Sequence, residues 1–285
     1  MAVLLVASAE PGVGRSVFAA ALAWRLARDG KRVTLARLAG DEGAAADAAA
    51  FASIEELMAP AQPVQAGDLK DVAGDVVAEA PAGPVDALAK QLDARVALVA
   101  TPSSRPLDVP PDRLETRILT RVPEAQVASL RVPGVAVVGE DRILAAPSVD
   151  DIARATKAEY LHRADEPISI ERVMLGTIAS DAASPYFGNR ERTCVVTRHD
   201  KTDVQLAALF TDMVCLVLTG GKPPSPYLLD RVSGRREEVA VLLAPGDTVE
   251  TMRAIEGLYG ASRFDGRGRM ERAVSLLDVA LPVPA

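Results

Sequence analysis

Short apolar runs alternate with amphipathic stretches of helical length along the first half of the chain. Runs such as Val3–Ala7 and Val96–Ala100 are typical of buried strands. The predicted strands are Val3–Ala7, Val33–Leu38, Val96–Ala100, Arg117–Val122 and Val135–Val138, and the predicted helices are Gly14–Arg28, Ala44–Met58 and Ser148–Tyr160, with helical pieces over Asp68–Lys90 broken by Pro81 and Pro84. Strands that alternate with helices predict βαβ units and a parallel sheet.

The same alternation begins again after Tyr160. Strands are predicted at Val173–Ala179, Thr193–Thr197, Met213–Leu218 and Val239–Leu243, with helices at Asp203–Leu209, Tyr227–Val232 and Thr248–Tyr259. We therefore expect an α/β protein of two domains, a larger one over residues 1–163 and a smaller one over 164–285 that ends in a C-terminal tail.

Composition narrows the classes of partner. The 285 residues carry a net charge of −7 and no basic block, which argues against nucleic acid or an anionic membrane. No apolar run reaches transmembrane length, and the N-terminal run lacks the basic start of a signal peptide. Cys194 and Cys215 lie inside apolar runs without a neighbouring histidine, so we expect two buried core thiols and a cytoplasmic protein.

The segment Ser8–Ser16 has the features of a phosphate-binding loop (P-loop). It joins a predicted strand to a predicted helix, where backbone N–H groups and the helix dipole converge on an anion. The usual lysine of the G-x-x-x-x-G-K-[ST] pattern is Arg15, and Ala9 stands where the first glycine is expected. The loop is therefore stronger evidence for a P-loop fold than for phosphoryl-transfer catalysis.

Further motifs accompany this loop in order. They are the strand end Leu35-Ala36-Arg37, the acidic segment around Asp41, Glu42 and Asp47, and the segment Gly139–Pro147. Together they resemble the dethiobiotin-synthetase-like P-loop domain found at the N-terminus of many bacterial phosphate acetyltransferases. The resemblance spans roughly residues 1–163 and implies a P-loop NTPase-like parallel sheet.

Active members of that wider family use two lysines on the nucleotide and carboxylates on magnesium. Here Arg15 and Arg37 match the lysines, and Ala100 falls where a glutamate is expected after the central strand. Losing that carboxylate makes Mg²⁺ doubtful, and arginine keeps the charge without the geometry of a lysine. The residues expected at an ATP or ADP site are Glu10, Pro11, Gly12, Val13, Gly14, Arg15, Ser16 and Arg37.

Other interpretations of these residues stay open at this point. The loop is either a nucleotide or phosphate site, a structural relic without a ligand, or an active ATPase site. Ser16 is either a ligand to phosphate or a helix cap, and Arg37 is either a ligand or a solvated strand end. We expect Asp41, Glu42 and Asp47 to form a solvated loop and helix start.

Three predicted strands of the second half each end in a polar or glycine-rich turn before a helix. In a parallel sheet these turns meet at one edge, where α/β folds bind ligands. Asp200-Lys201-Thr202 and Gly220-Gly221 resemble the motifs of a DRTGG domain, which the sequence is similar to over roughly 167–275. The resemblance implies a regulatory or assembly role. The expected ligand residues are Asp200, Lys201, Thr202, Asp203, Gly220, Gly221, Asp247 and Thr248, with plain turns and helix caps as the alternative.

Three functions follow from these patterns. The first is a stand-alone regulatory protein similar to the N-terminal region of phosphate acetyltransferase, without its catalytic domain, that binds a small anionic metabolite or nucleotide and forms homo-oligomers. The second is an ATP-dependent enzyme of the dethiobiotin synthetase class that activates a carboxylate. The third is a protein-interaction module without a ligand. We expect no catalytic residue and no metal site.

Overall fold

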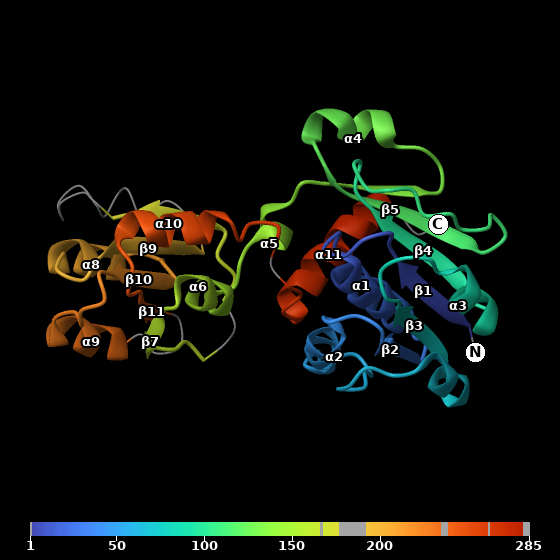
Figure 1. The fold of residues 1–285 in the computed structure, drawn as a ribbon, viewed down its shortest axis with the longest axis horizontal. Coiled ribbons are helices and arrows are strands. Elements are labelled where there is room, and N and C mark those ends of the chain that lie inside the picture. The colour runs from blue at the N-terminus through green and yellow to red at the C-terminus, as the bar shows by residue number, and fades with distance from the viewer. Residues whose placement is uncertain (1, 166–167, 177–191, 235–238, 262, 282–285) are drawn as a thin grey trace. The chain divides into compact units, whose positions relative to one another are not determined.

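The computed structural model describes residues 2–165, 168–176, 192–234, 239–261 and 263–281. It divides into two compact units, the first formed by Met1–Asp141 with Arg263–Ala285 and the second by Arg142–Ser262. Each unit is an α/β layer structure with its own sheet (Figure 1). In the described part of the chain, every helix is too short or too polar to span a membrane.

The first unit contains a six-stranded parallel sheet in the order β2-β3-β1-β4-β5-β6. Its strands are β1 (Val3–Ala7), β2 (Val33–Arg37), β3 (Asp75–Glu79), β4 (Arg95–Ala100), β5 (Leu114–Val122) and β6 (Val135–Gly139). Its helices are α1 (Arg15–Arg28), α2 (Ala44–Ala52), the 3-10 helix η1 (Ala66–Asp71), α3 (Asp86–Gln91), α4 (Glu124–Leu130) and α11 (Arg267–Ala280). The predicted parallel sheet is confirmed.

Strand β3 is absent from the sequence prediction. The segment Asp68–Lys90 was expected to be helical, yet it holds η1, β3 and α3 in turn. Val76, Val77 and Ala78 are each no more than 1% exposed, because β3 is hydrogen-bonded between β1 and β2 with both faces covered. A strand buried on both faces shows no period of two, and Pro81 and Pro84 belong to the turn that follows it.

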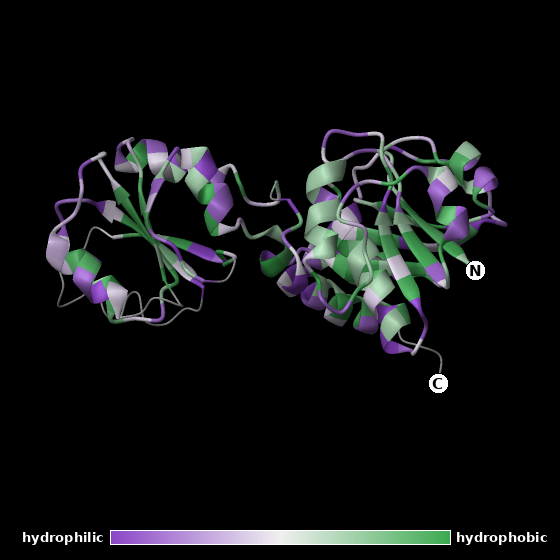
Figure 2. Cartoon of the chain, turned by 90° about the horizontal axis from the view of Figure 1, so that it is seen from below, coloured by the Kyte–Doolittle hydropathy of each residue, from purple (hydrophilic) through white to green (hydrophobic). Residues whose placement is uncertain are grey.

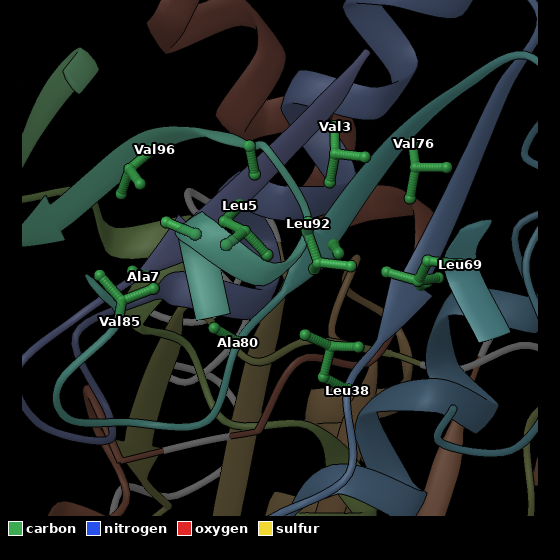
Figure 3. Close-up of a cluster of buried hydrophobic side chains, with 14 of the residues drawn as sticks. Val3, Leu5, Ala7, Leu38, Leu69, Val76, Ala80, Val85, Leu92 and Val96 are labelled. Atoms are coloured by element: carbon green, nitrogen blue, oxygen red, sulfur yellow. The ribbon is translucent and has the colours of Figure 1, made fainter. Parts of the chain in front are cut away.

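A hydrophobic core lies on one face of this sheet. Val3, Leu5 and Ala7 of β1 cluster there with Val96 of β4 and with Leu92, next to α3 (Figure 3). Helix α1 packs against β2, β3 and α11, and Phe18 of α1 is 1% exposed. The strands are mostly apolar and the helices alternate polar and apolar residues, as Figure 2 shows.

Helix α11 replaces the expected C-terminal tail. Its buried residues Met270, Ala273, Val274 and Leu277 follow helical spacing and pack toward α1 and β6. Salt bridges from Arg25 and Arg28 of α1 to Asp278 reinforce the contact, with N–O distances of 3.1 and 3.0 Å. The end of the chain therefore belongs to the first unit, whereas the sequence placed it in the second.

The second unit contains a five-stranded sheet in the order β7-β11-β10-β9-β8, in which only β7 is antiparallel among the described strands. Its strands are β7 (Glu159–His162), β8 (Arg172–Leu175), β9 (Thr193–Arg198), β10 (Cys215–Thr219) and β11 (Ala240–Leu243). Its helices are α5 (Arg142–Ala145), α6 (Val149–Thr156), α8 (Thr202–Leu209), α9 (Pro226–Ser233) and α10 (Thr248–Glu256). The end of the predicted strand Val173–Ala179 lies outside the described residues.

The second unit begins before the boundary that was predicted at residue 163, because it includes the helices α5 and α6. Ser148 caps α6 as expected, since its Oγ accepts from the backbone N–H of Asp151 at 3.1 Å. The helix ends earlier than predicted because Lys157 adopts a left-handed conformation, with φ of 55°. Tyr160 then lies in β7, which pairs with β11, and this pairing makes α6 and β7 part of the second unit.

Both faces of the second sheet are covered by hydrophobic side chains. Cys194 and Cys215 lie opposite each other on β9 and β10 and are fully buried free thiols, which confirms their expected place in the core. A hydrogen bond with Cys215 and burial together raise the pKa of the Cys194 thiol well above its usual value.

Candidate functional site

The P-loop lies between the end of β1 and the start of α1 (Figure 1). Gly12 and Gly14 have positive φ values of 78° and 92°, a conformation that favours glycine. Two side chains of strand β5 fix the position of the loop. Thr120 Oγ1 donates to the carbonyl of Val13 at 3.0 Å, and Arg121 donates to the carbonyl of Gly12 at 2.6 Å. The N-cap residue of α1 is Gly14, which has no side chain with which to cap the helix.

Arg15 directs its whole guanidinium group toward other side chains of the protein. Its Nε donates to Glu79 Oε1 at 2.7 Å, its Nη1 to Ser8 Oγ at 3.0 Å and its Nη2 to Asp41 Oδ2 at 3.2 Å. Only 7% of the residue is exposed. The residue that matches the P-loop lysine is therefore already neutralised by carboxylates.

Arg37, the match to the second lysine, is 1% exposed, which rules out the alternative of a solvated strand end. Its Nη1 donates to the Leu38 carbonyl at 2.6 Å, and its Nε contacts Asp47 Oδ2 at 3.2 Å and Glu79 Oε2 at 3.5 Å. It also forms a short ion pair with Asp41. Asp41 and Asp47 are thus ion-pair partners, where the sequence predicted a solvated loop.

Glu79, at the end of β3, joins the two arginines and was missed in the sequence. It is 1% exposed, and the Ser16 hydroxyl also donates to its Oε1, at 3.0 Å. Burial raises the pKa of this carboxyl group, while the charges of Arg15 and Arg37 act in the opposite direction. We call the five charged residues Arg15, Arg37, Asp41, Asp47 and Glu79 the loop charge cluster.

The end of β4 therefore supplies no carboxylate, and the acid that contacts Arg15 and Ser16 lies at the end of β3, on the other side of β1. Ala100 indeed ends β4, but the order of the sheet places the end of β3 beside the P-loop as well. The pattern Asp75-Val-Val-Ala-Glu79, followed by Pro81 and Gly83, was the signal that could have revealed it.

The remaining loop residues are more accessible. Pro11 and Gly12 are exposed, Val13 is buried, and Glu10 is half-buried with a carboxylate oxygen 3.8 Å from Arg105. Glu10 thus contacts a surface arginine and is not part of the loop charge cluster.

Magnesium does not fit this arrangement of donors. In P-loop NTPases the ion is held by the loop Ser or Thr and an acidic side chain. Here Glu79 Oε1 already accepts from both Ser16 and Arg15. Among the described residues, no group of three or more His, Cys, Asp or Glu side chains is arranged to hold a metal ion.

The turns of the second unit meet at one edge of its sheet, as predicted from parallel strands. The N–H groups of Gly220 and Gly221 donate to the carbonyls of Gly246 and Ala244 at 2.9 and 3.0 Å, which joins two of the turns. The His199 ring contacts the Thr219 carbonyl at 3.0 Å and joins the third. The edge is therefore assembled by direct bonds between its turns.

Several of the predicted ligand residues have structural partners at this edge. Asp247 caps α10 through the N–H groups of Val249 and Glu250, at 2.8 and 2.9 Å. Thr248 shares a hydrogen bond of 2.8 Å with Thr219. Asp200 pairs with Arg198, whose hydrogen bond lowers the pKa of the aspartate.

The other predicted ligand residues lie at the start of α8. Lys201 is the N-cap residue and is exposed, Thr202 opens the helix, and Asp203 is exposed in its first turn without acting as a cap. This helix start and the paired glycines are exposed at the edge, and so are Asp200 and Asp247.

Gly220 is expected to tolerate no side chain. Its φ is 94°, and a Cβ atom there would lie 2.9 Å from His199 Nδ1. Gly220→Ala should therefore displace the His199 ring from Thr219, which NMR can follow because the chain has 2 histidines. Gly257→Ala is the matched control, since its φ is −67° and its nearest contacts are 3.8 Å away. An unmoved His199 resonance in Gly220→Ala would contradict this description.

Comparisons with known proteins identify a family for the second unit. Residues 151–258 match the family model of the DRTGG domain. A solved structure of the CBS and DRTGG domains of the regulatory region of Clostridium perfringens pyrophosphatase, complexed with its activator diadenosine tetraphosphate, is similar at 18% identity and a TM-score of 0.36. The similarity covers 44% of this chain and about half, 53%, of that one, and at this level it carries no functional information. The family match shows that the second unit contains a DRTGG domain.

Proposed function

We propose that this chain is a non-hydrolytic regulatory protein whose P-loop binds the phosphate groups of a nucleotide or another small anion. The proposal rests in part on the resemblance of the first unit to the N-terminal region of bacterial phosphate acetyltransferase. A DRTGG domain in the second unit supports a regulatory role.

The loop charge cluster is the observation that carries the proposal. Phosphoryl transfer depends on cationic groups that bind the phosphates and stabilise the negative charge of the transition state. Arg15 and Arg37 are both buried and both bound to carboxylates. In this arrangement neither guanidinium is available to a transferring phosphate, so we expect binding without turnover.

The main chain of the loop supports anion binding by itself. Gly12 and Gly14 hold left-handed conformations, which can turn successive N–H groups toward an anion, and the N-cap residue Gly14 supplies no competing side-chain cap. The bonds from Thr120 and Arg121 occupy carbonyl oxygens of the loop and leave its N–H groups untouched. The phosphate site that we propose is therefore built from backbone.

One contact favours a second candidate, the ATP-dependent enzyme that activates a carboxylate. The Ser16 hydroxyl lies 3.0 Å from a carboxylate oxygen of Glu79, and a loop hydroxyl beside an acid is the pair that holds Mg²⁺ in P-loop NTPases. This function requires Arg15 to leave Glu79.

A pair of glycine variants tests anion binding at the loop. Gly12 and Gly30 have φ values of 78° and 81°, and a Cβ atom at either position meets nothing within 4 Å. Alanine at each site should cost a similar free energy of unfolding, about 1 kcal/mol. Only Gly12→Ala should weaken ATP or ADP binding in calorimetry, because only Gly12 lies in the P-loop.

Equal nucleotide affinity in both variants would place the binding elsewhere. No heat from the native chain at millimolar nucleotide would leave the second-unit ligand or an interaction module. The predicted metabolite site around Asp200 and Gly221 is tested separately by Asp200→Ala, and sedimentation equilibrium tests the predicted homo-oligomer.

A further inference from the structure

The guanidinium of Arg15 supplies positive charge to the acids beside the P-loop, as a bound metal ion would do. Arg15 Nη2 pairs with Asp41 and Arg15 Nε pairs with Glu79, and the same Glu79 oxygen accepts from the loop hydroxyl of Ser16. Mg²⁺ binding in proteins commonly uses one or two carboxylates together with waters and phosphate. The guanidinium of Arg15 therefore uses the acceptor oxygens that such an ion would need.

A second observation supports a cation position here. Glu79 Oε2 is buried and accepts no hydrogen bond from the described residues, although Arg37 Nε lies 3.5 Å away. Buried carboxylate oxygens are normally satisfied. Glu79 thus retains unused acceptor capacity beside the oxygen that Ser16 and Arg15 contact.

The charges of the cluster show what Arg15 contributes. Three carboxylates, from Asp41, Asp47 and Glu79, face two guanidinium groups. Without the Arg15 guanidinium, the same three carboxylates would face only Arg37. The resulting excess of negative charge in a buried region favours capture of a cation.

We propose that Arg15 is a built-in replacement for the divalent ion, and that removing its guanidinium uncovers a divalent-cation site formed by Ser16, Asp41 and Glu79. Anion binding by the native loop then requires no metal ion. This inference rests on the proposed function for the role of the loop, but the site itself can be tested without any nucleotide.

The test uses Mn²⁺ alone as the probe, followed by the EPR signal of the free ion. Arg15→Gln, which keeps hydrogen-bond donors and loses the charge, should bind one Mn²⁺ at least about tenfold more tightly than the native chain. Arg15→Lys should show no gain, because it keeps the positive charge. Arg95→Gln is the matched control, since Arg95 also pairs with a glutamate, Glu115, but on the surface.

Loss of folding is separated from loss of binding by denaturation. If Arg15→Gln is destabilised, Mn²⁺ should restore its unfolding midpoint, because an ion that binds only the folded state stabilises it. The proposal is overturned if Arg15→Gln gains neither affinity nor stability from Mn²⁺, or if the native chain binds the ion equally well. Failure of ATP to bind the native loop would instead overturn the proposed function and leave this result standing.

Discussion

Glu79→Ala is expected to lower the free energy of unfolding of the first unit by about 3–5 kcal/mol, the cost of removing one partner from a buried ion pair. Glu79 is 1% exposed and contacts Arg15, Arg37 and Ser16. Without it, the buried Arg15 Nε loses its acceptor and both guanidinium groups lose a charged partner.

Urea denaturation followed by the fluorescence of Trp24 measures this effect. The chain has 1 tryptophan, and it lies on α1, so the signal reports on the first unit alone. Glu115→Ala is the control, because Glu115 is half exposed and its surface pair with Arg95 should contribute about 0–1 kcal/mol. Glu79→Gln should fall between the two, since the amide keeps an acceptor without the charge. A cost for Glu79→Ala no larger than that for Glu115→Ala would contradict the loop charge cluster.

Leu277→Ala is expected to destabilise the same unit by about 2–5 kcal/mol, as other truncations of buried leucines do. Leu277 is fully buried on α11, the helix that packs against α1 and β6. The same Trp24 signal should report the change, although Leu277 is more than 250 residues further along the chain than α1 begins. That response is specific to a first unit that includes the end of the chain.

Val279→Ala provides the comparison on the same helix. Val279 is 73% exposed, so its truncation should change the free energy of unfolding by less than about 0.5 kcal/mol. If Leu277→Ala left the Trp24 transition unchanged, α11 would not belong to the core of the first unit.

The elements that the sequence predicted share one property: their periodicity or apolar run is local. Strand β1 has the predicted bounds, and α1 begins within one residue of its prediction. Strand β3 was missed because both of its faces are buried, and because Asp75 and Glu79 at its ends are four residues apart, as on one face of a helix. Helix α11 was missed because its stripe includes a buried arginine, Arg269, which looks polar in the sequence.

The candidate site shows the same division between local and distant information. The loop was recognised from Gly12, Gly14 and Arg15, which are close together in the chain. The partners of Arg15 are not: Glu79 lies 64 residues away and Asp41 lies 26 away. The pattern Asp75–Glu79 could have revealed the strand, but it is the sheet order β3-β1, a non-local property of the fold, that brings Glu79 to the loop.

We infer that the loop binds an anion while Arg15 takes the place of catalytic cations. The most direct test is calorimetric titration of the native chain with ATP, once with Mg²⁺ and once with EDTA, together with a phosphate-release assay on the same samples. We expect the same binding heat in both titrations and no phosphate release. Mg²⁺-dependent phosphate release that is lost in Arg15→Ala would contradict it and would establish the enzyme instead.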